Sequence, residues 1–227
     1  MAKLVWDNTG ERFYETGVKN VALYVFDNAS EAKKYKEGVA WNGVTAISES
    51  PSGAEPTALY ADDKKYLNLL SAEEFAASIE AYTYPDEFAE CDGSASLVAG
   101  VTVGQQTRSK FALAYKTTIG NDEVGNSFGY KLHIIYNCLA APSEKAYNTI
   151  NDSPEAITFS WEISTTPVTF TANGKEYSTA CITIDSRKVN KTKLETLEEK
   201  LFGGADELKK PTLVLPDEIY ETLKEGA

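Results

Sequence analysis

Strict alternation of apolar and polar side chains is the feature that most constrains the fold of this chain. From residue 157 to 163, apolar residues occupy every second position, with Trp161 among them and Thr, Ser and Glu between. Successive side chains of a β-strand point to opposite faces, so this pattern predicts a strand with one buried and one wet face. The same alternation in 107–116 and 128–136 predicts a long hairpin around the polar loop 120–126.

Asn-Gly pairs indicate tight turns, because a type I′ turn needs positive φ at both central positions. The pair at 173–174 predicts a hairpin between strands at 168–172 and 177–184. The pair at 42–43 predicts either another hairpin or a bulge inside one strand.

Residues 71–84 fit two structures. Ser71 and Glu74 form a capping-box pattern typical of a helix, whereas apolar residues at alternate positions from 75 onward favour a strand. We predict a strand here, followed by a short helical turn at 86–91.

Helical periodicity is concentrated in the last forty or so residues. Residues 190–202 carry leucines at i, i+3 and i+7 and are followed by two glycines, and a second short helix is predicted near Pro216. The composition changes near residue 189. We therefore expect a mainly β domain over 1–188 and a helical extension over 189–227.

Charge and hydropathy exclude several classes of partner. The chain has 34 acidic and 22 basic residues, a net charge of −12. Affinity for nucleic acid comes mainly from Lys and Arg, so tight binding to DNA, RNA or an anionic membrane is not expected. No apolar run approaches the ~20 residues of a membrane span, and the N-terminus lacks a signal-peptide pattern. We expect the protein to be made in the cytoplasm, outside any membrane.

Residues that carry catalysis or bind cofactors form no recognisable motif. Cys91, Cys138 and Cys181 lie far apart without a CxxC, and the last two fall in apolar runs typical of a core. The single histidine, His133, is expected on the polar face of a strand. The sequence contains no G-x-S-x-G, P-loop or dinucleotide fingerprint. We therefore expect neither an enzyme nor a cofactor.

Acidic residues cluster between 49 and 92, where eleven Asp and Glu side chains are opposed only by Lys64 and Lys65. Such a cluster is typical of a solvated face. The spacing of a calcium-binding EF-hand is absent. A glycosidase carboxylate pair stays an alternative, because the sequence does not give the separation between carboxylates.

The connection from 48 to about 65 is unusual in its length and chemistry. Pro51 and Pro56 favour extended backbone with few internal hydrogen bonds, and Leu59 and Tyr60 are unexpected in a free surface loop. Connections this long inside a compact domain usually have a function. We interpret this one as a segment that packs against another chain.

Basic residues share the polar faces of the predicted long hairpin: Arg108, Lys110, Lys116 and Lys131. They could touch phosphate. Without aromatic residues interleaved on the same faces, we interpret them as solvated or ion-paired instead.

Six stretches across residues 1–190 carry a recognisable resemblance. They are GERFYETGV at 10–18, WNGVT at 41–45, GAEPTALYAD at 53–62, EAYTYPDEF at 80–88, INDSPEA at 150–156 and WEISTTPV at 161–168. In these stretches the chain resembles the major tail protein (tail tube protein) of long-tailed phages of Gram-positive bacteria. The extension after 189 contributes less to the likeness.

The resemblance implies a tail-tube-type β-sandwich or barrel that forms rings, expected to be hexameric, which stack into a tube. One sheet of each subunit would line a lumen through which double-stranded DNA passes without tight binding. The implied partners are further copies of the chain, a tape measure protein inside the tube, and tail terminator and distal tail proteins at its ends. The implied location is the virion tail, after assembly in the host cytoplasm.

The resemblance also implies site residues. The connection at about 48–70 corresponds to the family's loop that contacts the adjacent ring, through Pro51, Glu55, Pro56, Leu59, Tyr60, Asp62 and Asp63. The lumen candidates are Glu74, Ser78, Glu80, Lys110 and Lys131, so an acidic and a mixed lining both stay open.

Two other functions stay open beside this one. Related folds form the tubes of contractile tails and secretion machines, so the fold alone does not choose among them. A non-catalytic β-sandwich that binds carbohydrate or protein would use Trp6, Trp41 or Trp161 as an exposed platform.

Overall fold

A computed structural model describes residues 3–27, 35–150, 152–153, 155–206 and 209–224, so that Asn151 and Pro154 of the 150–156 motif lie outside the described residues. The described chain is mainly β, as predicted. Its strands are β1 (Phe13–Val25), β2 (Val39–Ala40), β3 (Val44–Glu49), β4 (Ser52–Gly53), β5 (Pro56–Ala61), β6 (Lys64–Leu70), β7 (Glu73–Glu74), β8 (Ala76–Ala81), β9 (Ala95–Val98), β10 (Val101–Val103), β11 (Phe111–Asn121), β12 (Gly125–Ala140), β13 (Phe159–Ser164), β14 (Val168–Ala172), β15 (Lys175–Thr179) and β16 (Cys181–Asp185). The helices are the 3-10 helix η1 (Asp86–Glu90), α1 (Lys191–Phe202) and α2 (Pro216–Leu223).

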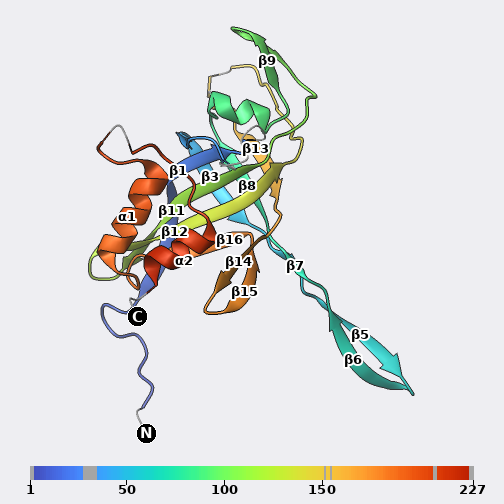
Figure 1. Cartoon of the computed structure of the whole chain (residues 1–227), viewed down its shortest axis with the longest axis vertical. Coiled ribbons are helices and arrows are strands. Elements are labelled where there is room, and N and C mark those ends of the chain that lie inside the picture. The colour runs from blue at the N-terminus through green and yellow to red at the C-terminus, as the bar shows by residue number, and fades with distance from the viewer. Residues whose placement is uncertain (1–2, 28–34, 151, 154, 207–208, 225–227) are drawn as a thin grey trace.

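The long β11–β12 hairpin is the centre of the fold, and it confirms the hairpin predicted from alternation. The antiparallel order is β2-β1-β11-β12-β13-β8-β3, and β16 also pairs with β12. β13 meets β12 only through Leu139 and Ala140. The strands therefore form two layers, β2-β1-β11-β12-β16 and β13-β8-β3, which are joined at one corner (Figure 1).

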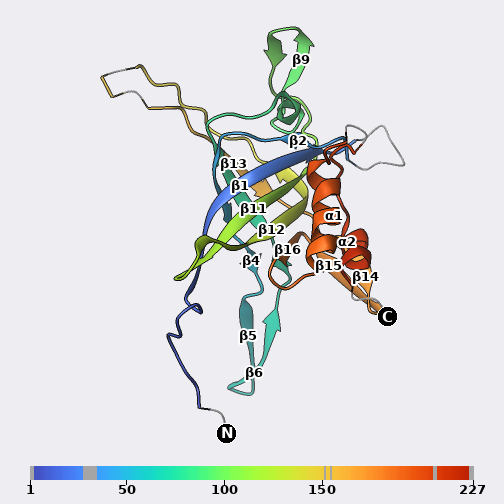
Figure 2. The same ribbon diagram turned by 90° about the vertical axis from the view of Figure 1, so that its left-hand side faces the viewer.

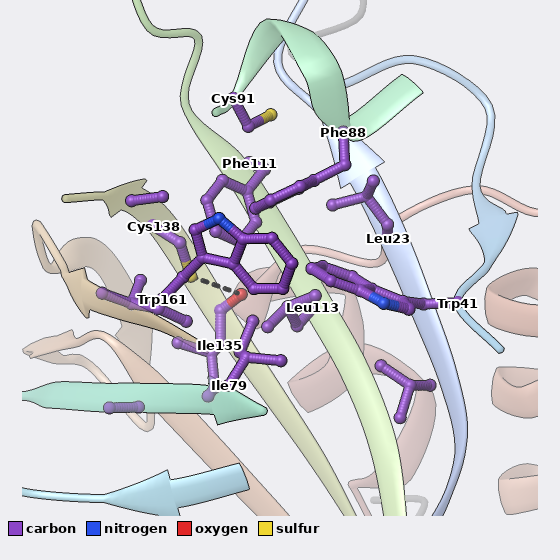
Figure 3. Close-up of a cluster of buried hydrophobic side chains, with 14 of the residues drawn as sticks. Leu23, Trp41, Ile79, Phe88, Cys91, Phe111, Leu113, Ile135, Cys138 and Trp161 are labelled. Carbon is purple, nitrogen blue, oxygen red and sulfur yellow. Dashed lines mark hydrogen bonds between the residues drawn. The ribbon is translucent and has the colours of Figure 1, made fainter. Parts of the chain in front are cut away.

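The main core lies between these two layers and is rich in aromatic side chains (Figure 3). Trp161 of β13 is fully buried, and its ring meets Phe88 of η1 at 5.0 Å and Trp41 at 5.7 Å between centroids. Trp41 donates a hydrogen bond to the carbonyl of Thr83 at 2.8 Å. Burial of such rings contributes roughly 1.5–3 kcal/mol each or more. Their positions explain why alternate residues of β13 and β8 are apolar.

A second core covers the other face of the larger layer. α1 and α2 lie on that face (Figure 2), and Leu194, Leu197 and Leu201 pack there against Ile134 and its neighbours. The predicted helix at 190–202 is confirmed, with the Asn190 side chain accepting from the backbone N–H of Lys193 at 3.3 Å. The sheet is thus buried on both faces.

Burial on both faces corrects the prediction for His133. The alternate residues of β12 that include Leu132 and Ile134 face the helices, whereas His133 and Ile135 face the other way, into the sandwich. His133 is consequently buried, at 8% exposure, rather than on a solvated polar face. Cys138 is buried as predicted, and Cys181 is half-buried.

The two Asn-Gly pairs have different outcomes. Asn173 and Gly174, with φ of 50° and 71°, join β14 to β15 and confirm that hairpin, although its second arm ends at Thr179 and the chain continues as the separate strand β16. A hairpin at 42–43 is wrong, because β2 pairs with β1 whereas β3 pairs with β8. The turn there carries the chain from one layer to the other.

The prediction of a strand at 71–84 is confirmed by β8, in which Ala77, Ile79 and Ala81 are buried, and η1 confirms the helical turn after it. The connection at 48–70 is not the hydrogen-bond-poor extended loop predicted from Pro51 and Pro56. It contains the hairpin β5–β6, which projects from one end of the molecule (Figures 1 and 2).

Candidate assembly surfaces

The β5–β6 hairpin is built by local chemistry. Its strands pair from Pro56 and Leu70 at the base to Ala61 and Lys64 at the tip. The turn residues Asp62 and Asp63 have φ of 48° and 57°, the positive values of a type I′ turn. Aspartate tolerates this region better than most residues, because its short side chain can hydrogen-bond locally. Pro51 precedes the hairpin and Pro56 is the first residue of β5, so neither proline prevents β5 from pairing with β6.

All seven residues expected in the ring-contact loop are exposed and lie on this hairpin or at its base: Pro51, Glu55, Pro56, Leu59, Tyr60, Asp62 and Asp63. The hairpin also exposes Tyr66 (73%), Leu69 (60%) and Leu70 (65%), which the sequence reasoning did not single out. Their signal was present, as the apolar residues of 66–70, but the prolines upstream favoured a loop interpretation.

Nothing in the described part of the chain covers this hairpin. β5 has extensive contacts only with β6. On one face, Leu59 lies opposite Leu67, with Leu69 next along the same strand. An isolated two-stranded hairpin is at best marginally stable in water, and exposed apolar groups of this density mark contact sites. The geometry is that of an arm that gains stability when another surface covers it.

A second candidate surface is the outer face of the β13-β8-β3 layer. On β8, Ser78 and Glu80 point away from the core residue Ile79. Ser160 lies opposite Glu80, and Glu162 lies opposite Ser78. Serine, alanine and glutamate thus make up this face, whose charged groups are acidic.

Glu162 was missed as a lumen candidate. The alternation placed it on the wet face of its strand, but only the pairing of β13 with β8 places it beside Ser78. Strand pairing between segments about 80 positions apart is invisible in local periodicity.

The other lumen candidates lie elsewhere. Glu74 is exposed on β7 and pairs with Ser52 at the base of the projecting hairpin. Lys110 is exposed just before β11, and Lys131 lies opposite Thr117, seven positions further along β11. Seven strand residues span about 23 Å, so the two lysines are far apart. Lys131 pairs with Glu15 at 2.5 Å, and Arg108 with Asp92 at 3.7 Å.

A polar cluster around His133 closes one end of the sandwich. Nδ1 of His133 lies 3.5 Å from Glu49 of β3, and Nε2 lies 3.7 Å from Glu15 of β1. The Tyr115 ring stacks on the imidazole at 4.8 Å, and its hydroxyl donates to Glu49 at 2.7 Å. The cluster therefore ties the two layers together.

The protonation of this cluster follows from its burial. Burial lowers the pKa of His133 below its usual range, although Glu49 and Glu15 oppose the shift. Burial would raise the pKa of Glu15, but hydrogen bonds from Lys131 and Thr117 lower it overall. Burial and the bond to Glu49 raise the pKa of Tyr115 far above neutrality. Near pH 7 the cluster thus holds an ionised Glu15 and a neutral histidine.

Three edges of the large sheet are open within the described residues: β16, which pairs only with β12, and two edges that lie at the ends of the strand order. β2 pairs with β1 only at Ala22 and Leu23, so the first half of β1 has a partner on one side alone. β3 is the last strand at the other end of the order. Unpaired edges of this kind are templates for pairing with another chain.

In the part of the chain that the structure describes, no three or more His, Cys, Asp or Glu side chains are grouped so as to hold a metal ion. No helix among the same residues has the length and apolar character needed to cross a bilayer.

Comparison with known proteins leaves the family open. No protein-family model and no curated protein match the sequence. One solved structure that the chain resembles is that of the anti-feeding prophage (AFP) baseplate, determined by cryo-EM with sixfold symmetrisation. The match has a TM-score of 0.37 and 8% identity, and it covers 80% of this chain and 97% of that chain. A likeness of that size carries no argument on function, which must come from the residues and geometry above.

Proposed function

We propose that this chain is the structural subunit of a phage tail tube, a non-catalytic protein whose copies form rings that stack into a tube conducting DNA. The observation that carries the proposal is the β5–β6 hairpin, which projects from the body with its leucines and tyrosines uncovered. It occupies the position of the ring-contact loop that the sequence resemblance implies. The open edges of β1 and β3 add sites at which neighbouring subunits can pair within a ring.

The outer face of the β13-β8-β3 layer supplies the lumen wall in this proposal. Sixfold repetition would place rings of Glu80 and Glu162 around the channel. At physiological salt the field of exposed charges reaches about 8 Å, enough to keep phosphates off the wall without blocking a wide pore. Lys131 faces into the sandwich and pairs with Glu15, which favours an acidic over a mixed lining.

The remaining assignments follow from the tube. Residues 1–188 would form the tube domain, and 189–227 an extension on its outer side, where α1 and α2 already cover the sheet. The partners would be further copies, a tape measure protein inside, and tail terminator and distal tail proteins at the ends. A contractile or secretion tube is the related alternative. A carbohydrate platform is weaker, because Trp41 and Trp161 are buried and only Trp6 is exposed.

The decisive experiment removes the arm and keeps the body. β4 pairs with β7 through Gly53 and Glu73, so residues 54–72 can be excised and replaced by Asn-Gly, which closes a two-residue hairpin. Purified variant and unmodified chain are compared by thermal unfolding and negative-stain microscopy. We expect tubes from the unmodified chain, and a folded variant that forms none. Tubes of normal length from the variant would contradict the proposal.

A second experiment addresses the lumen. Phage carrying Glu80→Lys and Glu162→Lys should assemble tails but eject DNA more slowly, and the defect should shrink as salt shortens the reach of the charges to about 3 Å at 1 M. Glu176→Lys, on the exposed strand β15, is the matched control. Unchanged ejection by the double variant would show that this face does not line the channel.

A further inference from the structure

A second projecting hairpin, β9–β10, lies at the opposite end of the long axis of the molecule from β5–β6 (Figures 1 and 2). Val98 lies opposite Val101 in it, and Leu97 is the extra residue where the register shifts. All three are exposed, Leu97 at 65%. Each strand of this hairpin has extensive contacts only with the other. The described chain therefore carries two uncovered apolar hairpins that point in opposite directions.

We propose that β9–β10 is a docking surface for a second copy of this chain, which it contacts through the β5–β6 hairpin of that copy. This inference rests on the proposed tube and adds the surface that receives the β5–β6 hairpin of the next copy. Contact between different patches at opposite ends of one molecule is a heterologous contact, which propagates along an axis rather than closing a dimer.

Charge identifies the occupant as another copy. Each chain carries −12, so two copies repel wherever their charged surfaces meet. Residues 93–107, which include the whole hairpin, contain no charged side chain. In 56–70, Asp62 and Asp63 are balanced by Lys64 and Lys65, for a net charge of zero. The two hairpins are thus electroneutral and apolar parts of an acidic protein, at which copies can meet without net like-charge repulsion.

The body holds β9–β10 in a defined position. Asp92, directly before it, has a side chain only 7% exposed and accepts from Trp161 at 3.0 Å and from Lys145 at 2.6 Å. Arg108, directly after it, lies 3.7 Å from Asp92 and donates to the carbonyl of Ala140 at 3.2 Å.

The base of the hairpin is also closed by backbone. The N–H of Gln106 donates to the carbonyl of Gly93 at 2.9 Å. Gly93 has a φ of 76°, and a Cβ there would lie 3.1 Å from the Gln106 carbonyl oxygen, so this close approach requires glycine. The apolar tip of the hairpin is exposed, and its base is held by the buried Asp92 and its partners. Such a hairpin is preorganised for binding, because little conformational freedom is lost when a partner covers it.

Cross-linking tests the contact directly. In a Cys181→Ser background, cysteines replace Tyr60 on β5 and Val101 on β10, together and singly, and a short bifunctional maleimide is added. The two positions lie at opposite ends of one molecule, so a bridge between them joins different copies. We expect a ladder of covalent oligomers from the double variant in assembled samples, and at most dimers from each single variant. Tubes that give no ladder would overturn the proposal.

A matched pair of variants separates this inference from the tube itself. Val98→Ser with Val101→Ser should leave the thermal unfolding of the monomer unchanged and raise the concentration needed for tube formation at least tenfold. Ser96→Thr with Thr102→Ser, on the same hairpin, should leave both unchanged. Normal tubes from the valine variant would overturn the inference and leave the proposed function standing. Failure of the unmodified chain to form rings or tubes would overturn both.

Discussion

The hairpins β5–β6 and β14–β15 share local design but differ in what covers them. Both are two-stranded, and both turn through two residues with positive φ, Asp62-Asp63 in one and Asn173-Gly174 in the other. β14–β15 packs against α2, where Tyr220 donates to Asn173 at 2.8 Å and Ala172 is buried. β5–β6 has no extensive contacts with any other element of the described chain. The same turn geometry thus builds a hairpin that packs on the monomer in one place and a projecting hairpin in the other, which we propose is an arm for a partner.

The largest expected difference concerns hydrogen exchange. In the monomer, amides of β5–β6 should exchange through local opening at a free-energy cost near zero, whereas amides of β11–β12 should approach the global value of about 5–15 kcal/mol. In assembled samples the β5–β6 amides should become protected, and those of β14–β15 should change little. Exchange measured by mass spectrometry on both samples checks this. Strong protection of β5–β6 in the monomer would mean that its own chain covers it.

A matched leucine substitution gives the next largest effect. Leu197→Ala removes a fully buried side chain of α1 and should cost about 2–5 kcal/mol of unfolding free energy. Leu69→Ala removes a side chain that is 60% exposed on β6 and should stay within about 0.5 kcal/mol of the unmodified monomer. Urea unfolding measures both. Leu69→Ala should nevertheless weaken assembly. If Leu69→Ala destabilises the monomer as much as Leu197→Ala does, the β5–β6 hairpin is packed within its own chain and the contrast is wrong.

A smaller effect on stability is expected where α2 packs against β14–β15. Tyr220→Phe removes the bond to Asn173 and should lower the unfolding free energy by about 0.5–1 kcal/mol, since the bond is exposed. Tyr60→Phe, on the uncovered hairpin, is the control and should leave the monomer unchanged. Equal losses from both variants would remove the distinction between the two hairpins.

The smallest expected effect is a pH dependence of the covered body. Burial lowers the pKa of His133 in the folded state, whereas in the unfolded chain this pKa has its usual value of 6.5. As the pH falls through 6.5, the unfolded chain therefore binds more protons than the folded chain. The stability of the monomer should therefore fall as pH drops from 7 towards 5, above the range where Glu15 titrates. His133→Gln should flatten that slope in denaturant titrations at several pH values. If stability falls with pH as steeply in His133→Gln as in the unmodified chain, another group causes the pH dependence.

Local pattern was sufficient to predict much of the fold. The alternation predicted β13 and the β11–β12 hairpin, the Asn-Gly pair at 173–174 predicted β14–β15, and the leucine spacing predicted α1. These features depend on neighbours within a few residues, where backbone preference and the need to bury one face agree. The proline-containing stretch at 51–70 misled, because prolines at a strand start or edge do not prevent pairing.

The positions of several residues and hairpins are determined by the tertiary structure alone. The order of strands placed Glu162 beside Ser78 and buried His133 between Glu15 and Glu49. The same folding placed two hairpins of zero net charge at opposite ends of an acidic molecule (Figure 1). The sequence by itself determined that strands, turns and helices form at these places, because their causes are local. Which faces are covered, and which are left for a partner, depends on contacts between residues far apart in the chain, and only packing decides it.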